Sequence, residues 1–196
     1  MKPNIPVYPP KYLLLIAAGL GSRMKAVSSL PKELIPILGK PAIQYAIEEG
    51  VAAGLTNIIV VINHKKDIIR RYLEDPDFRV KLYPNIADDL TNTIKKCSFI
   101  FLYQKTPSGE VNAIRLAAHI IKNNTFAIIY PDDIHYPFGT ALPILCHNFF
   151  KTGDNIIGLS HVDSTIAPTI GNTGRVTLRA VTDDLYDILY FHPKSP

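Results

Sequence analysis

The chain has 196 residues, which is enough for one domain with a substantial hydrophobic core and short for two. Hydrophobic residues make up 47% of the chain and charged residues 19%, a composition that excludes an intrinsically disordered protein and is typical of a globular one. The formal net charge of +4 is spread over short basic pairs, and no dense basic run is interleaved with aromatic residues, so nucleic acid is not an expected partner.

The cysteines and the apolar runs indicate the cellular compartment in which we expect the protein. Cys97 and Cys146 lack C-x-x-C spacing, so we expect reduced, buried thiols in a cytoplasmic protein. No apolar run approaches the roughly 18 residues of a transmembrane helix, so no membrane segment is expected. The apolar run that follows Lys11 imitates the core of a signal peptide, but it is short and four prolines stand in the ten residues before it. We therefore assign this run to the first strand of the fold.

The first part of the chain predicts a strand that ends in a glycine turn. Residues 1–11 are rich in proline and predict an extended arm, and the apolar run Tyr12–Ala18 predicts a buried strand. The turn Gly19–Arg23 follows this strand and leads into a loop predicted over Met24–Leu30. The domain is therefore expected to begin at residue 12 and to extend over 12–196.

Helices and strands alternate over the rest of the chain. The predicted strands are Asn57–Asn63, Ser98–Gln104, Phe126–Tyr130, Asn155–His161, Arg175–Ala180 and Tyr186–Phe191. The predicted helices are Pro41–Gly54, Lys65–Glu74 (stopped by Asp75-Pro76), Asp89–Lys96, Gly109–Lys122 and Phe138–Phe150, the last with a kink or restart at Pro143. The stretch Phe78–Asp88 is ambiguous and is interpreted as a short strand and a loop. The alternation predicts an α/β fold of three layers, with a mostly parallel, Rossmann-like sheet flanked by helices.

The glycine turn carries groups that suit a phosphate. Glycines let the backbone approach a phosphate closely, and Arg23 and Lys32 add two cations. A lone G-x-G is a weak signal, however, and a turn that is glycine-rich for steric reasons only is an open alternative. The Rossmann fingerprint is excluded because a third glycine is missing, and the P-loop is excluded because G-K-[ST] is absent.

Polar groups also follow two further predicted strands, at Gln104–Gly109 and at Asp132-Asp133. Ligands of open α/β sheets bind beyond the carboxyl ends of the strands, so these groups are expected to converge with the glycine turn on a nucleotide site. Asp132 is a candidate ligand for Mg²⁺, and a turn or helix-capping aspartate is the alternative. A transition-metal cluster of Asp132, Asp133 and His135 is a further, weaker alternative.

The stretch from Tyr12 to Ile62 resembles the opening of the sugar-1-phosphate nucleotidyltransferases, and within them the bacterial UTP–glucose-1-phosphate uridylyltransferases, or UDP-glucose pyrophosphorylases. Their pattern is A-A-G-x-G-[ST]-R-M, then P-K-E, then K-P-x-I-x-Y and E-x-x-x-A-G. The matching residues are Ala17-Ala18-Gly19, Gly21-Ser22-Arg23-Met24, Pro31-Lys32-Glu33, Lys40-Pro41, Ile43, Tyr45, Glu49 and Ala53-Gly54. The resemblance implies a magnesium-dependent transfer from UTP to glucose 1-phosphate, which gives UDP-glucose and pyrophosphate.

The resemblance also implies roles for single residues. They are Ala17, Ala18, Gly19, Gly21 and Ser22 around the nucleotide, Arg23 and Lys32 on the phosphates as catalytic groups, Gln104 on the uracil edge, Gly109 under the ribose, and Asp132 on Mg²⁺.

Several positions depart from the family's pattern. Val111 replaces the second glycine of G-L-G-x-A, and Phe191 and His192 stand where the family's V-E-K-P motif has glutamate and lysine. The chain also ends before the family's C-terminal segment, which supplies another metal carboxylate and association helices. One alternative is therefore a catalytically impaired relative that binds the nucleotide but has low or absent turnover. A second alternative is the same type of reaction with another sugar or base. Formation of a homo-oligomer is also left open.

Overall fold

The structure is a computed structural model that describes residues 7–21, 28–84, 88–106, 109–163, 165 and 175–193. It divides into two compact units, Met1–Gly158 and Leu159–Pro196. Within the first unit, Val7–Lys11 belong to no helix or strand. No helix of the described part is long and apolar enough to cross a membrane.

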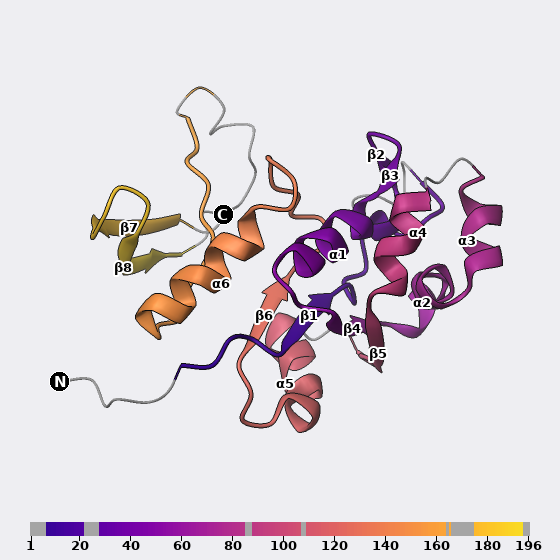
Figure 1. The fold of residues 1–196 in the computed structure, drawn as a ribbon, viewed down its shortest axis with the longest axis horizontal. Coiled ribbons are helices and arrows are strands. Elements are labelled where there is room, and N and C mark those ends of the chain that lie inside the picture. The colour runs from indigo at the N-terminus through magenta and orange to yellow at the C-terminus, as the bar shows by residue number, and fades with distance from the viewer. Residues whose placement is uncertain are drawn as a thin grey trace. The chain divides into compact units, whose positions relative to one another are not determined.

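A parallel sheet forms the centre of the first unit. Its strands among the described residues are β1 (Tyr12–Ile16), β4 (Asn57–Ile62), β5 (Ser98–Tyr103) and β6 (Phe126–Ile129), in the order β5-β4-β1-β6 (Figure 1). Strand β1 lies inside the sheet, with Leu14 opposite Ile59 of β4 on one side and opposite Ile128 of β6 on the other. Strand β1 therefore carries its carboxyl end, and Gly19 shortly after it, to the middle of one sheet edge.

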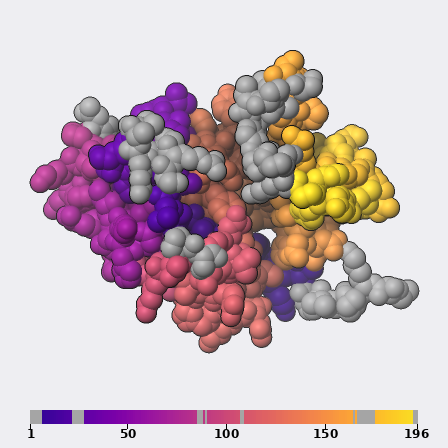
Figure 2. All heavy atoms as spheres, turned by 180° about the vertical axis from the view of Figure 1, so that it is seen from behind, coloured from indigo at the N-terminus to yellow at the C-terminus, as the bar shows by residue number. Residues whose placement is uncertain are grey.

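Helices cover both faces of this sheet (Figure 1). They are α1 (Ala42–Ala52), α2 (Asp67–Glu74), α3 (Pro76–Leu82), α4 (Asp88–Lys95), α5 (Glu110–Ile121) and α6 (Ala141–Thr152). Because side chains alternate along a strand, Leu13 and Leu15 pack against α1, α2 and α6, whereas Leu14 packs against α5. Residues of α5 form a large part of the surface seen from behind (Figure 2). The predicted α/β fold is confirmed.

Short elements position the second half of the candidate site. The 3₁₀ turn η2 (Lys32–Leu34) precedes a small hairpin of β2 (Pro36–Ile37) and β3 (Lys40–Pro41), and the 3₁₀ turn η3 (His64–Lys66) follows β4. The hairpin is closed at Gly39, whose φ of +80° favours glycine.

The short strand predicted within Phe78–Asp88 was wrong, because Phe78–Leu82 belong to helix α3 and Asp88 begins α4. Asp75 caps the helix by accepting a hydrogen bond from the N–H of Phe78 (2.9 Å), and Pro76 occupies its first turn. The same Asp75-Pro76 pair therefore ends one helix and begins the next.

The strand predicted over Asn155–His161 was also wrong. These residues pair with no strand of the described part, and Ile157 and Leu159 are half exposed. An apolar stretch forms a strand only where a neighbouring strand supplies hydrogen-bond partners, and these residues have no such neighbour in the described part. Pro143 neither kinks nor restarts α6, because it lies in the first helical turn, where no backbone donor is needed.

The second unit contains the strands β7 (Arg175–Ala180) and β8 (Tyr186–His192), which form an antiparallel hairpin. Both strands were predicted from the sequence. They pair with each other in a sheet of their own, and an ion pair between Arg179 and Asp187 (2.5 Å) joins them.

The two cysteines are free and half-buried. Burial raises the pKa of Cys97 to about 11 and also raises the pKa of Cys146. Both thiols are therefore protonated near neutral pH and are weak nucleophiles.

Glu49, the glutamate of the E-x-x-x-A-G pattern, has a structural role in this fold. Its side chain is buried on α1, and its two carboxylate oxygens accept hydrogen bonds from the N–H groups of Gly139 (2.7 Å) and Leu142 (2.9 Å) at the start of α6. The carboxylate thus joins α1 to α6 and satisfies donors that the helix cannot satisfy itself.

We expect Glu49→Ala to lower the free energy of unfolding by about 2–4 kcal/mol, because two hydrogen bonds to a buried charge are lost. Urea denaturation measures this loss. Glu48→Ala is the matched control, since Glu48 pairs with Lys40 (2.5 Å) near the surface and such pairs contribute about 0–1 kcal/mol. Equal losses in the two variants would contradict the assigned role of Glu49.

Candidate active site

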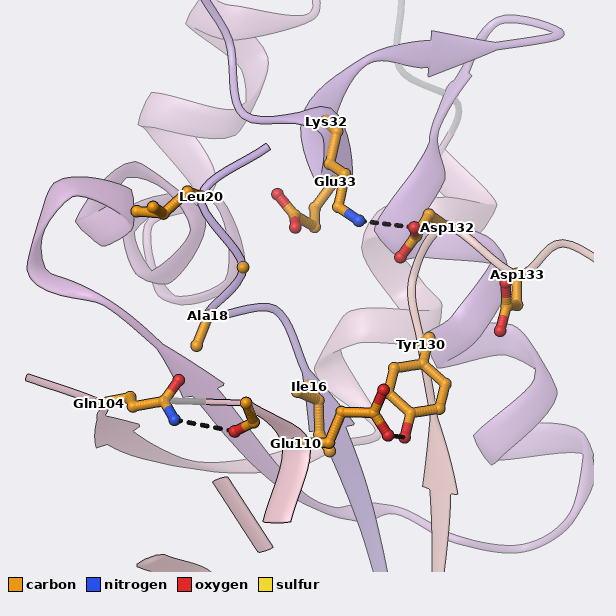
Figure 3. Close-up of a pocket in the computed structure, with 12 residues that line it drawn as sticks. Ile16, Ala18, Leu20, Lys32, Glu33, Gln104, Glu110, Tyr130, Asp132 and Asp133 are labelled. Atoms are coloured by element: carbon orange, nitrogen blue, oxygen red, sulfur yellow. Dashed lines mark hydrogen bonds and ion pairs between the residues drawn. The ribbon is translucent and has the colours of Figure 1, made fainter. Parts of the chain in front are cut away.

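A pocket of about 570 Å³ opens at the carboxyl edge of the parallel sheet (Figure 3). Its wall contains Ile16, Ala18, Gly19, Leu20, Lys32, Glu33, Gln104, Gly109, Glu110, Tyr130, Asp132 and Asp133. These residues end or follow β1, follow β5 and β6, or belong to η2 and the start of α5. The ends of the three strands therefore meet in one pocket, as the sequence predicted.

Most of the predicted site residues lie in this wall. The structure brings together Ala18, Gly19, Lys32, Gln104, Gly109 and Asp132. Ala17 is buried directly behind the wall, and Gly21, with a φ of +59°, continues the turn. Ser22 and Arg23 lie outside the described residues. The individual roles assigned to all of these residues remain predictions.

Lys32 and Asp132 face each other in the pocket, although they are far apart in the sequence. Lys32 Nζ lies 2.5 Å from Asp132 Oδ2, as the dashed line in Figure 3 shows. Both side chains are partly open to solvent, so this pair adds little to stability. The ion pair instead fixes the positions of its two side chains. It places one cation and one carboxylate at a point in the pocket where a phosphate chain and a metal ion could meet.

Asp133, the neighbour of Asp132, also lines the pocket. Burial raises the pKa of Asp133, and the negative charge of Asp132 adds to this rise. Among the described residues, no three His, Cys, Asp or Glu side chains gather into a group that could hold a metal ion, so the alternative of a cluster with His135 has no support there.

Gln104 is held rigidly at the end of β5. Its backbone N–H donates to the carbonyl of Ile62 (2.8 Å), and its side-chain Nε2 donates to the carbonyl of Gly109 (3.1 Å). Gly109 has a φ of +88°, which only glycine adopts readily, and this conformation turns the chain into α5. The side-chain amide of Gln104 is thus oriented by a hydrogen bond within the protein.

Glu110 and Tyr130 form a second polar pair in the pocket that the sequence reasoning missed. The hydroxyl of Tyr130 donates to Glu110 Oε2 (2.9 Å) across the wall (Figure 3). Burial and the carboxylate of Glu110 both raise the pKa of Tyr130. The signal that could have found Glu110 is its place directly after Gly109, where this chain departs from the family's G-L-G-x-A pattern.

Comparison with known proteins decides the family. The nucleotidyl transferase family model matches residues 12–166 of the chain. The chain belongs to the nucleotidyl transferase family. Within it, this nucleotidyl transferase resembles the UTP–glucose-1-phosphate uridylyltransferases, as its opening motifs indicated.

Two curated relatives illustrate the similarity. UTP–glucose-1-phosphate uridylyltransferase 1 of Staphylococcus saprophyticus is 36% identical over 159 residues, which cover 78% of this chain and 55% of the relative. UTP–glucose-1-phosphate uridylyltransferase of Bacillus subtilis is 35% identical over 155 residues, which cover 76% of this chain and 53% of the relative. The nucleotidyl transferase described here thus spans just over half the length of these relatives.

Solved structures agree on the fold. A UDP-glucose pyrophosphorylase in complex with UDP-glucose matches with a TM-score of 0.78 and 26% identity over 95% of this chain and 69% of that one. A UTP-bound UGPase from Acinetobacter baumannii matches with a TM-score of 0.71 over 95% of this chain and 68% of that one. Because the sequence identity is 21%, this match supports the fold alone.

Proposed function

We propose that this nucleotidyl transferase transfers the uridylyl group of UTP to glucose 1-phosphate and so forms UDP-glucose and pyrophosphate. The observation that carries the proposal is the pocket in which Lys32 and Asp132 face each other near Gly19 at the end of β1. The similarity to UTP–glucose-1-phosphate uridylyltransferases supports the choice of base and sugar. The cytoplasmic location expected from the sequence is part of the same proposal.

In the proposed reaction, a phosphate oxygen of the sugar 1-phosphate attacks the α-phosphorus of UTP. The bond from this phosphorus to the bridging oxygen breaks, and its electron pair leaves with pyrophosphate. Such displacements need neutralised charge and alignment rather than covalent help from the protein. Lys32 supplies one positive charge to the phosphates, and we assign a second to Arg23. The backbone of Ala18 and Gly19 holds the nucleoside.

The pocket also suits Mg²⁺, the metal that the resemblance implies. Asp132 and Asp133 place carboxylate oxygens in the wall beside Lys32, and Mg²⁺ is commonly held by one or two carboxylates together with substrate phosphates. Asp132 would hold the ion, which when bound neutralises charge on the phosphates.

Gln104 is proposed to supply the base selectivity. A side-chain amide can pair with both a carbonyl and an N–H group of uracil, and this amide is already fixed by Gly109. We expect Gln104→Ala to weaken the binding of UTP by about ten-fold and to leave the binding of inorganic triphosphate close to the wild-type value. Calorimetric titration of both ligands decides, and an equal loss for the two ligands would make Gln104 merely structural.

A second candidate function is nucleotide binding without efficient turnover. Phe191 and His192, at the family's glutamate and lysine positions, lie on β8, where Phe191 is exposed and His192 Nε2 is 2.8 Å from the hydroxyl of Thr177. A phenylalanine cannot accept hydrogen bonds from sugar hydroxyls. This observation favours a binder over an enzyme.

One experiment separates the two functions. Pyrophosphate release is measured from UTP with a panel of sugar 1-phosphates, with and without Mg²⁺, and UTP binding is measured by calorimetry on the same sample. Release with glucose 1-phosphate supports the first function, and binding without release supports the second. If UTP neither binds nor reacts, both proposals fail.

A further inference from the structure

A buried ion pair joins Glu33, which belongs to the pocket wall, to Lys66, which does not, and neither residue has a role assigned so far. Lys66 Nζ is 2.7 Å from Glu33 Oε1, and the two side chains are 7% and 0% exposed. The same ammonium donates to the carbonyl of Ala17 (3.0 Å). One buried cation therefore joins the end of β1, the loop after β4, and η2, the turn that carries Lys32.

A second side chain of the loop after β4, that of Asn63, contacts Ala18, the residue that follows Ala17. Asn63 Nδ2 donates to the carbonyl of Ala18 (2.7 Å), and its Oδ1 accepts from the N–H of Lys65. Both carbonyls that precede the glycine turn are thus held from the loop after β4. A peptide unit is planar and trans, so fixing these carbonyls also fixes the N–H groups of Ala18 and Gly19, two residues that line the pocket.

The ion pair is poorly suited to a role in stability alone. Burial lowers the pKa of Lys66, and the charge and hydrogen bond of the adjacent Glu33 carboxylate oppose this effect without cancelling it. Glu33 Oε2 is buried and accepts no hydrogen bond from the described residues. Apolar side chains of similar volume often replace such pairs without loss of stability. What they cannot replace is the set of directed hydrogen bonds that spans three segments of the site.

We propose that Lys66 is a positioning residue, which holds the backbone of Ala18 and Gly19 together with Lys32 in the arrangement that lets both reach one phosphate chain. Lys66 is not part of the wall itself and acts through the carbonyl of Ala17 on one side and the wall residue Glu33 on the other. The proposal rests on the proposed function in taking UTP as the ligand, and it adds a residue that the opening motifs do not contain.

The test compares Lys66→Met with Arg79→Met. Arg79 is a matched control because it is also a buried cation that holds backbone carbonyls, those of Tyr72 and Leu73 (2.9 Å each), but it lies away from the pocket wall. Two measurements are made on each variant. Amide hydrogen exchange over Ala17–Leu20 is followed without ligand, and the affinities for UTP and uridine are determined by calorimetry.

For Lys66→Met we expect faster exchange over Ala17–Leu20 and UTP binding weaker by about ten-fold or more, because the phosphate contacts are misaligned. Uridine affinity should stay close to the wild-type value. For Arg79→Met, exchange at this turn and UTP affinity should stay unchanged, although both variants lower the thermal midpoint. Unchanged exchange and UTP affinity in Lys66→Met, or an equal loss in Arg79→Met, would overturn the proposal.

A double variant, Glu33→Leu with Lys66→Met, separates positioning from stability. It replaces the whole pair by apolar side chains, so the thermal midpoint should recover toward the wild-type value. UTP affinity should remain low, because the carbonyl of Ala17 has lost its donor. If UTP affinity recovers together with stability, Lys66 acts through stability only. The exchange measurement needs no ligand, so it decides the proposal even if the wild-type protein fails to bind UTP and the proposed function is wrong.

Discussion

Replacing Lys32 by methionine is expected to lower kcat/KM for nucleotidyl transfer by about 100- to 1,000-fold, the usual effect of removing one positioned group that stabilises transition-state charge. Lys32 Nζ is a cation in the pocket wall, and Asp132 fixes its position at 2.5 Å. Methionine keeps the length and most of the volume of the side chain, so the loss reflects the charge. Pyrophosphate release under steady-state conditions measures it, and UTP affinity is expected to fall by about ten-fold in parallel.

Lys40→Met is the matched control. Lys40 also forms an ion pair of 2.5 Å, with Glu48, and its ammonium lies 4.1 Å from the centre of the Tyr45 ring, outside the pocket wall. Both variants remove one lysine that is paired with a carboxylate, but only Lys32 faces the proposed phosphates. If Lys40→Met reduces kcat/KM as much as Lys32→Met does, a general effect of charge would explain the loss and Lys32 would have no special role.

The parallel sheet could be predicted because each of its strands is marked by a short apolar run in the local sequence. The runs Leu13–Leu15 and Ile58–Ile62 are apolar and fully buried, as is typical of inner strands in a parallel sheet that is covered on both faces. Helix α3 was missed because its start depends on the cap at Asp75, which was read only as the end of the preceding helix. Asn155–His161 was overpredicted because an apolar pattern does not reveal whether a neighbouring strand exists.

The candidate site could be predicted only in part, for a related reason. Gln104 directly follows the apolar strand β5, and Asp132 stands three residues after the end of β6, so their place at the sheet edge follows from chain order. Lys66 and Asn63 act through contacts with Ala17 and Ala18 across more than 40 positions in the sequence. The sequence pattern assigns Asn63 to the end of a strand and Lys66 to the start of a helix. No local pattern marks such contacts.

Replacing Asp132 by asparagine is expected to lower kcat by about 100-fold or more and to raise the Mg²⁺ concentration needed for half-maximal activity. The physical reason is that asparagine has nearly the same shape but lacks the charge that would hold the ion and that orients Lys32 at 2.5 Å. Asp133→Asn is the control, because Asp133 is the adjacent pocket carboxylate and makes no ion pair with Lys32 among the described contacts. Its effect should be much smaller.

The binding of UTP with and without metal distinguishes a metal ligand from a turn aspartate. In the presence of a chelator, Asp132→Asn should bind UTP at least as tightly as the wild-type protein, because a negative charge near the phosphates is removed and Lys32 loses its competing partner. With Mg²⁺ present, the order should reverse, since the wild-type carboxylate then contributes to holding the ion between protein and phosphates. A loss of affinity that is the same under both conditions, together with a lower thermal midpoint, would show that Asp132 serves the turn after β6 and leave the metal to another group.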